Sequence, residues 1–192
     1  MSAPFTSPRT LMSLLMGASM LVASGAQGAE APIRNQDISR AALSSTLVEM
    51  AFSPKQQAVF VSAPDWKQET QSRVLRLDPT TLKIEAEIPQ KVKGFGVALD
   101  DADNRLYLTQ GFDGAVGVVD TATNRNLAEI ALQNKVNLEQ AYRAAGLQGE
   151  KLDFLLAELK RFKLTDDYLY KIREIKFDAK TGRLFLPGLG YG

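Results

Sequence analysis

The chain has 192 residues, of which 45% are hydrophobic and 23% are charged, and its formal net charge is +1. It contains no cysteine and no histidine. This composition excludes disulfides, thiol nucleophiles, Ser-His-Asp triads, and zinc, haem or copper sites that depend on Cys or His. The balanced charge gives no support to nucleic-acid binding driven by total charge. Chemistry would have to come from carboxylates, Lys, Tyr and Ser or Thr.

The first 28 residues predict a secretory signal peptide. Arg9 is the only charged residue before Glu30, residues 11–23 are an apolar run, and residues 24–29 are mostly small. The run is shorter than the roughly 20 apolar residues of a membrane span, and there is no cysteine for a lipid anchor. We therefore expect export to the periplasm. A hydrophobic N-terminal helix packed in the core is the alternative.

Residues 29–46 are a polar lead-in, which either pairs with a strand to close a propeller or stays a flexible leader. A β-patterned repeat follows. Phe52, Leu99 and Phe177 each end an apolar run, a polar turn comes next, and a second apolar run begins. The copies lie 47 residues apart for Phe52 and Leu99, a period typical of four-stranded propeller blades.

The second copy, LYLTQGFDGAVGVVDTATNRNLAEI, resembles the YVTN-type propeller repeat. Residues 41–192 resemble the N-terminal part of the YncE-like periplasmic propellers. The resemblance implies an all-β propeller of seven blades and a periplasmic address, with no settled catalytic residues. We assign a partial propeller to 47–192, with blade 1 at 47–90, blade 2 at 94–133 and the start of blade 3 at 172–192.

Only about two and a half blades are accounted for, whereas propellers close with four to eight blades. We therefore expect the sequence to be a truncated fragment of a longer reading frame. A blade cannot bury both of its apolar faces without neighbours.

Residues 134–171 interrupt the β pattern and predict a helical hairpin. Asn137 and Gln140 form a capping box, with Leu138 and Tyr142 on one helical face. A second helix is predicted over about 150–162 from leucines at helical spacing. The hairpin either packs on the propeller rim or serves as a partner-binding device.

Acidic residues at 100, 101 and 103 do not form a calcium loop, because the EF-hand spacing fails. We interpret them, together with Asp78 and Asp120, as turn residues that bond nearby backbone amides. The sequence Gly94-Phe95-Gly96 lacks the third glycine of a nucleotide fingerprint.

The candidate site lies at one end of the propeller. Antiparallel strands place the loops 62–73, 109–115 and 131–171 at the same end, and these loops differ in length between copies. Binding residues concentrate on such loops. The candidates for ligand or partner binding are Trp66, Phe112 and Asp113, with Tyr142 as an outlier in the insert. In the alternative interpretations Trp66 packs against the blade edge and the insert merely caps the propeller end.

We expect an exported, non-catalytic binding or scaffold module whose partner is a periplasmic protein or a small ligand. No cofactor, metal site or membrane span is expected. Two other classes stay open. One is a lactonase-like hydrolase that uses carboxylates and a metal at the channel mouth. The other is a single-stranded nucleic-acid binder that stacks bases on Trp66 and Phe112.

The signal peptide can be tested by intact-mass measurement of the protein recovered from the periplasm. The mass should show the loss of roughly 26–31 N-terminal residues, because the small residues after the apolar run supply the cleavage site. Recovery of the full-length form from the cytosol would contradict export.

Overall fold

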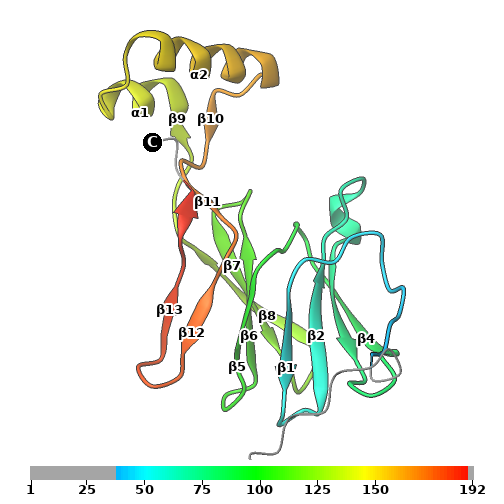
Figure 1. Ribbon diagram of the computed structural model, residues 1–192. Coiled ribbons are helices and arrows are strands. Elements are labelled where there is room, and N and C mark those ends of the chain that lie inside the picture. Colours follow the sequence, from blue (N-terminus) through cyan, green and yellow to red (C-terminus); the bar gives the residue numbers. More distant parts are fainter. Residues whose placement is uncertain (1–37, 190–192) are drawn as a thin grey trace, which may run out of the picture. The chain divides into compact units, whose positions relative to one another are not determined.

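A computed structural model describes residues 38–189 of the 192 (Figure 1). The predicted signal peptide and residues 29–37 of the lead-in lie outside this range. Between residues 38 and 189 no helix is long and apolar enough to cross a membrane.

Two four-stranded antiparallel sheets follow one another along the chain, each with its strands in sequential order. The first sheet consists of β1 (Met50–Ser53), β2 (Ala58–Ala63), β3 (Arg73–Leu77) and β4 (Ile84–Pro89). The second consists of β5 (Val97–Asp100), β6 (Arg105–Gln110), β7 (Ala115–Asp120) and β8 (Arg125–Ala131). β12 (Lys176–Asp178) and β13 (Arg183–Phe185) form a third, two-stranded sheet. The chain is thus an all-β partial propeller, with two blades and the start of a third.

The three sheets share one register, as the repeat predicts. Phe52 pairs with Val59, Leu99 with Leu106, and Phe177 with Leu184, so the same repeat positions oppose each other in every copy. Both complete blades also have a register shift in the pairing of the third and fourth strands, between Arg76 and Leu77 in one and between Val118 and Val119 in the other. The repeat therefore extends to irregularities of the backbone.

The acidic turn residues mostly behave as predicted. The Asp78 Oδ1 atom accepts hydrogen bonds from the Thr80 and Thr81 amides at 3.0 and 2.6 Å. The Asp120 Oδ1 atom accepts from the amides of residues 122 and 123 in the same way. These bonds stabilise the ionised form and lower the pKa of both carboxyls. Asp101 differs, because its carboxylate accepts from the Ser53 hydroxyl and, at 3.0 Å, from the Lys55 amide, and so joins one blade to the next.

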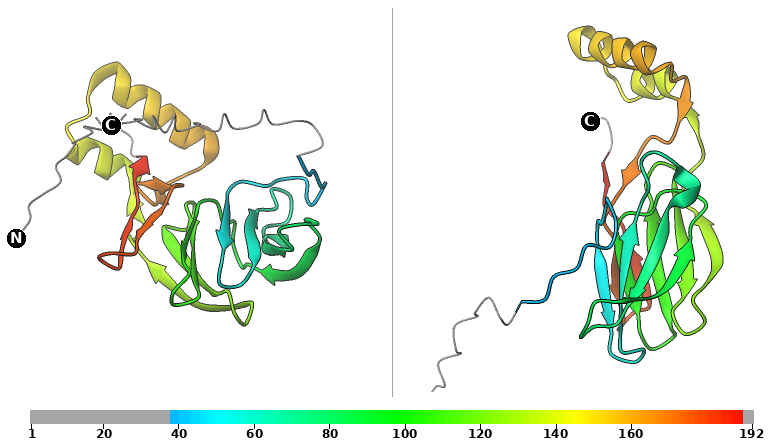
Figure 2. Two further views of the ribbon diagram at one scale, coloured as in Figure 1. Left: turned by 60° about the horizontal axis from the view of Figure 1, so that its bottom comes forward. Right: turned by 90° about the vertical axis from the view of Figure 1, so that its right-hand side faces the viewer.

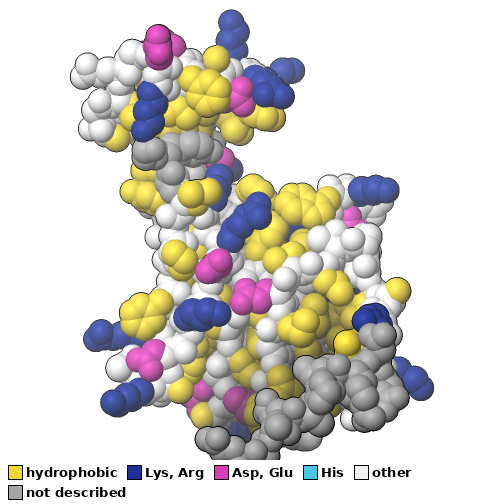
Figure 3. Space-filling model, in the orientation of Figure 1, with side chains coloured by type: hydrophobic (Ala, Val, Ile, Leu, Met, Phe, Trp, Pro, Cys, Tyr) yellow, Lys and Arg dark blue, Asp and Glu magenta, His cyan; other side chains and the backbone are white. Residues whose placement is uncertain are grey.

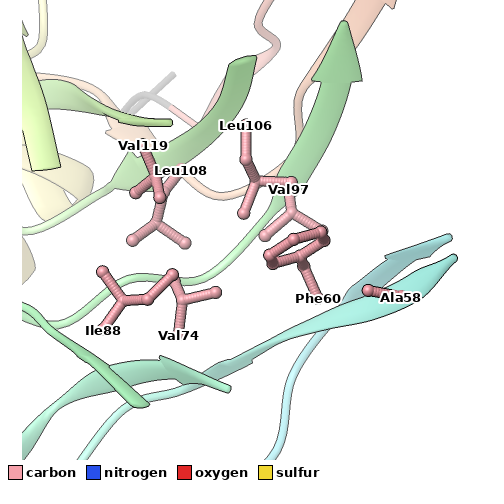
Figure 4. Close-up of a cluster of buried hydrophobic side chains, with 8 residues drawn as sticks. All are labelled: Ala58, Phe60, Val74, Ile88, Val97, Leu106, Leu108 and Val119. Atoms are coloured by element: carbon pink, nitrogen blue, oxygen red, sulfur yellow. The ribbon is translucent and has the colours of Figure 1, made fainter. Parts of the chain in front are cut away.

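The main core lies between the first two blades (Figure 4). Its eight buried residues are Ala58, Phe60, Val74, Ile88, Val97, Leu106, Leu108 and Val119. A second cluster joins Ala98 and Val116 of the second blade to Ile175 of the third. The second blade is therefore covered on both faces, as a propeller blade needs to be. The strand pattern predicts six buried positions in this blade, and only one of them, Leu99, is partly exposed; the six are Val97, Leu99, Leu106, Leu108, Val116 and Val118.

A buried hydroxyl at the end of the second strand links each blade to the next. The Ser62 hydroxyl accepts from the Glu49 amide at 3.2 Å and donates to the Phe95 carbonyl at 2.5 Å. The Thr109 hydroxyl accepts from the Gly96 amide at 2.8 Å and donates to the Arg173 carbonyl at 2.7 Å. Each hydroxyl thus connects the first strand segments of two neighbouring blades. The third copy has Pro187 at this position, ten residues after Phe177.

The insert is a helical hairpin on a short two-stranded ladder (Figures 1 and 2). The ladder pairs β9 (Val136–Asn137) with β10 (Asp166–Asp167). Helix α1 (Leu138–Ala144) begins after Asn137, whose side chain accepts from the Gln140 amide at 3.0 Å, so the predicted cap is confirmed. Helix α2 (Gly149–Phe162) follows.

The helices bury their apolar faces against each other rather than against the blades. The buried residues of this cluster are Leu138, Tyr142 and Leu152, and every apolar side chain packed on them lies between residues 147 and 169. After the insert, β11 (Lys171–Ile172) pairs with β14 (Gly188–Leu189) and returns the chain to the propeller.

The core register can be tested with Leu108→Ala. The Leu108 side chain is fully buried between two blades, so its removal leaves a cavity and should cost about 2–5 kcal/mol of unfolding free energy. Leu127→Ala is the matched control, because Leu127 is exposed on β8 of the same blade and should change stability by less than about 0.5 kcal/mol. Equal losses in urea denaturation would show that the strand faces are assigned wrongly.

Candidate functional site

Two of the predicted candidates, Trp66 and Phe112, come together at the end of the blades from which the insert departs. Their ring centroids are 6.1 Å apart in an edge-to-face arrangement. A third ring, Phe95, lies 5.9 Å from Trp66 and 5.4 Å from Phe112. Phe95 is 2% exposed, whereas Trp66 is 54% and Phe112 is 39% exposed. Two open aromatic surfaces therefore rest on one buried ring.

The loop that carries Trp66 is held by its own hydrogen bonds. Asp65 Oδ1 accepts from the amides of Lys67 and Gln68 at 2.7 and 2.8 Å, which lowers the pKa of this carboxyl. The Asp65 amide in turn donates to the Ser72 hydroxyl at 3.0 Å, across the base of the loop. Trp66 is thus carried by a closed loop, and its ring packs on Phe95 and Phe112 of the second blade.

Phe112 lies in the tight turn between β6 and β7. The Asp113 amide donates to the Gln110 carbonyl at 2.9 Å and closes the turn. Gly114 follows with φ +61, a conformation that favours glycine. The short turn leaves the Phe112 ring at the surface.

A basic side chain lies over each of the three rings. Lys93 Nζ is 5.9 Å from the centroid of Trp66, and Lys171 Nζ is 5.8 Å from that of Phe112. The Arg173 guanidinium carbon is 5.3 Å from the centroid of Phe95. Each distance is within the range of a cation–π contact. Hydrophobic and basic side chains also gather at this end in the space-filling view (Figure 3).

Both lysines also form ion pairs. Lys93 Nζ is 2.7 Å from Glu69, and Lys171 Nζ is 2.7 Å from Asp167. The paired carboxylates hold the lysines in place and offset part of their charge. Glu69 is itself stabilised in its ionised form, because the hydrogen bond from Lys93 lowers its pKa.

Asp113, the third candidate, is a partly buried carboxylate beside this group. Burial raises its pKa, the negative charge of Glu69 raises it further, and Lys93 acts in the opposite direction. Its Oδ2 atom is buried and has no hydrogen-bond partner among the described residues. The carboxyl therefore has an acceptor that its own surroundings leave unused.

The segment that supplies Lys171 and Arg173 lies directly on the second blade. A Cβ atom at Gly96 would be 2.1 Å from the Arg173 carbonyl oxygen, and one at Gly111 would be 2.1 Å from that of Ile172. Only glycine permits this close approach. The Gly94-Phe95-Gly96 sequence thus serves backbone packing and presents Phe95, in agreement with our rejection of a nucleotide fingerprint.

Tyr142, the fourth candidate, lies elsewhere. It is 1% exposed in the hydrophobic core of the insert, between Leu138 and Leu152. Its ring is therefore not part of the surface that Trp66 and Phe112 form.

Sequence reasoning missed Phe95, Lys93, Lys171 and Arg173. A signal for two of them was present, because Phe95 and Arg173 each lie four residues before the end of an apolar run, at Leu99 and Phe177. Equivalent repeat positions are expected to face the same end of a propeller. Lys93 and Lys171 lie in connections, where the repeat gives no such guide.

Carboxylates also occur just before the first strands, at Glu49 and Glu174, each three residues before Phe52 or Phe177. Both line a crevice of about 390 Å³, together with Arg173 and Lys176. Glu49 Oε2 accepts from the Val97 amide at 3.1 Å, and Glu49 Oε1 is 3.8 Å from Lys176 Nζ. Within the part of the chain that the structure describes, no group of three or more Asp or Glu residues is placed to hold a metal ion.

The sequential four-stranded sheets and their face-to-face packing place the chain among the β-propeller repeat proteins. No established family model matches it. The chain is 30% identical to the Uncharacterized protein YncE of Salmonella typhi over 135 residues, which cover 70% of this chain and 37% of that protein. It is 26% identical to the Uncharacterized protein YncE of Escherichia coli K12 over 136 residues, with the same two shares. The resemblance to the YncE-like family is thereby confirmed.

The chain spans about 37% of the length of these relatives, whose names describe no activity. Among solved structures, the hydrazine synthase of Kuenenia stuttgartiensis aligns with 78% of this chain and 32% of its own, at 17% identity and a TM-score of 0.45.

The environment of Asp113 predicts a pH-dependent effect of Asp113→Asn. Because the folded-state pKa is raised, the folded state binds the proton more tightly, and ionisation costs stability as the pH rises above 3.8. The substitution should therefore raise the unfolding free energy at pH 7, by less than about 1 kcal/mol because the group is partly exposed, and the gain should shrink towards pH 4.

Asp65→Asn is the control with the opposite sign. Its folded-state pKa is lowered, so the ionised carboxylate stabilises the loop above pH 3.8 and loses this effect as the pH falls. Urea denaturation at several pH values measures both variants. A loss of stability in Asp113→Asn at pH 7 would contradict the assigned environment.

Proposed function

We propose that the chain is part of an exported periplasmic β-propeller that acts as a non-catalytic binding module. The site is the group of Trp66, Phe112 and Asp113 at the insert end, completed by the buried Phe95 ring. The observation that carries the proposal is the contact between rings from different segments of the chain, two of them open to solvent. Large exposed aromatic side chains held in fixed positions are typical of binding sites.

The basic residues define what the site would accept. Lys93, Lys171 and Arg173 lie over the rings, and Asp113 contributes an unused acceptor. A ligand with a flat apolar group and nearby negative charge would find a surface for stacking and cations for pairing.

The insert supports this function by where its connections lead. It leaves the second blade after β8 and returns through Tyr170, whose amide and carbonyl both bond the Gln133 side chain, at 3.2 and 2.6 Å. The next residue is Lys171, which lies over Phe112. Deletion of the helices should therefore disturb the site through Lys171 even if the helices touch no ligand.

A pull-down from periplasmic extract tests the proposal, with the chain as bait. Trp66→Ala and a deletion of 137–163 should each reduce the bound proteins or ligands at least several-fold, because one removes an open ring and the other displaces Lys171. Phe52→Ala is the matched control, since Phe52 is an exposed aromatic residue at the opposite end of β1. If Phe52→Ala lost the bound partners and Trp66→Ala kept them, the site would lie at the opposite end of the blades and the proposal would be wrong.

A single-stranded nucleic acid is the second candidate ligand. The favouring observation is local, because the two exposed rings, Trp66 and Phe112, each have a lysine beside them in a chain of balanced total charge. Stacking of one base on an aromatic side chain contributes about 1–3 kcal/mol, with a strong dependence on salt.

The same variants test this candidate. Trp66 is the only tryptophan, so its fluorescence reports directly on the site. Titration with a thymidine oligonucleotide should quench it, more weakly at higher salt, and Lys171→Met should weaken binding. Quenching that is indifferent to salt and to Lys171 would exclude nucleic acid while leaving a small-ligand or protein partner in place.

A further inference from the structure

The ammonium group of Lys171 has three close neighbours at the joint between the insert and the blades. Its Nζ atom lies 5.8 Å from the ring centroid of Phe112, 6.0 Å from that of Tyr168 and 2.7 Å from Asp167 Oδ2. The Lys171 and Asp167 side chains are each only 18% exposed. Phe112 belongs to the second blade, whereas Asp167 and Tyr168 belong to the segment that returns from the helices. The position of this cation therefore depends on both parts of the fold.

Tyr168 is seated on the turn that carries Phe112. A Cβ atom at Gly114 would be 2.4 Å from Tyr168 Cδ1, so the ring lies directly against the backbone of this turn. Gly114 thus gives the ring its space, besides having a backbone conformation that favours glycine. Lys135 lies in the segment that leads into the insert, and its Nζ atom is 5.4 Å from the centroid of the same ring. The Tyr168 ring therefore has neighbours in the turn, in the outgoing segment and in the returning segment.

Asp167 joins the backbone of Tyr168 to the head of Lys171. Asp167 pairs with Val136 in the ladder at the base of the insert. Its Oδ1 atom accepts a hydrogen bond from the Tyr168 amide at 2.8 Å, and its Oδ2 atom forms the ion pair with Lys171. The ladder thus fixes the point from which both the Tyr168 ring and the Lys171 cation are held.

We propose that Tyr168 is a positioning residue of the aromatic site, which keeps the Lys171 ammonium over the Phe112 ring. The inference rests on the proposed function, because it gives Tyr168 a part in that binding. A lysine head in contact with one ring alone has freedom to swing away, whereas a second ring and a carboxylate confine it. A cation that is already in place loses less conformational entropy when a ligand binds. Through the Tyr168 ring, the base of the insert therefore sets the geometry of the site.

Binding of phenyl phosphate tests the role of the ring. This probe combines a flat apolar ring with negative charge, and the fluorescence of Trp66, the only tryptophan, reports on the site. Tyr168→Ala and Tyr168→Leu should each weaken binding by about five-fold, the size expected for a partly buried cation–π contact. Tyr168→Phe should stay within about two-fold of the unmodified chain, because the contacts described above involve the ring and not the hydroxyl.

Two further variants make this comparison specific. Tyr168→Leu still covers the Gly114 turn, so it replaces Tyr168→Ala if the alanine variant fails to fold. Tyr170→Ala is the matched control, since it removes an exposed ring two residues further along and should change binding by less than about two-fold. An equal loss of affinity in Tyr168→Phe and Tyr168→Leu would overturn the proposal, because the hydroxyl would then be the active group.

A second measurement needs no ligand. Ring currents from Phe112 and Tyr168 should move the ε-methylene NMR signals of Lys171 upfield of those of an ordinary lysine. Tyr168→Leu should return these signals part of the way, and Tyr168→Phe should not. If Tyr168→Leu leaves both the signals and the affinity unchanged, the positioning role is wrong while the proposed function stands. If the unmodified chain does not bind phenyl phosphate, the proposed function fails and the inference fails with it.

Discussion

The structure depends on the contact of one blade with the next. Neither face of a four-stranded sheet can be left open without cost, and here Phe60 and Ile88 of one blade close on Leu106 and Leu108 of its neighbour. Burial of apolar side chains has no directional preference, so it does not by itself fix the position of one sheet along the other. The hydroxyls of Ser62 and Thr109 supply that information, because each bonds the backbone of two blades at once.

This alignment is what assembles the aromatic group. Trp66, Phe95 and Phe112 lie in three different connections. Along the chain they are separated by 17 to 46 residues. Phe95 is held through its carbonyl by Ser62, and Arg173 through its carbonyl by Thr109. The residues that orient the two blades are thus bonded to the residues that bear the Phe95 ring and its cation. The hydroxyls that align the blades therefore also fix the backbone of Phe95 and of Arg173.

Much of this architecture could be predicted from the sequence because it is local. Strand register follows from alternation and from turn residues such as Asp78 and Asp120, and the helix start follows from a cap between Asn137 and Gln140. The end of the propeller that carries Trp66 and Phe112 follows from counting antiparallel strands. The partners of these rings could not be predicted, because the contact with Phe95 depends on the offset between sheets. Tyr142 shows the complementary limit, since periodicity places it on the apolar face of a helix but does not say what that face covers.

Pro187 gives the repeat an asymmetry with a mechanical meaning. The position that holds Ser62 in one blade and Thr109 in the next has here a ring without a hydroxyl or an amide hydrogen. Whatever packs on the far face of β13 cannot be fastened by the bond that fastens the other two. Of the three copies in the described chain, the third is therefore the one that lacks this hydroxyl, and the alignment of a neighbour on that side would have to come from other contacts.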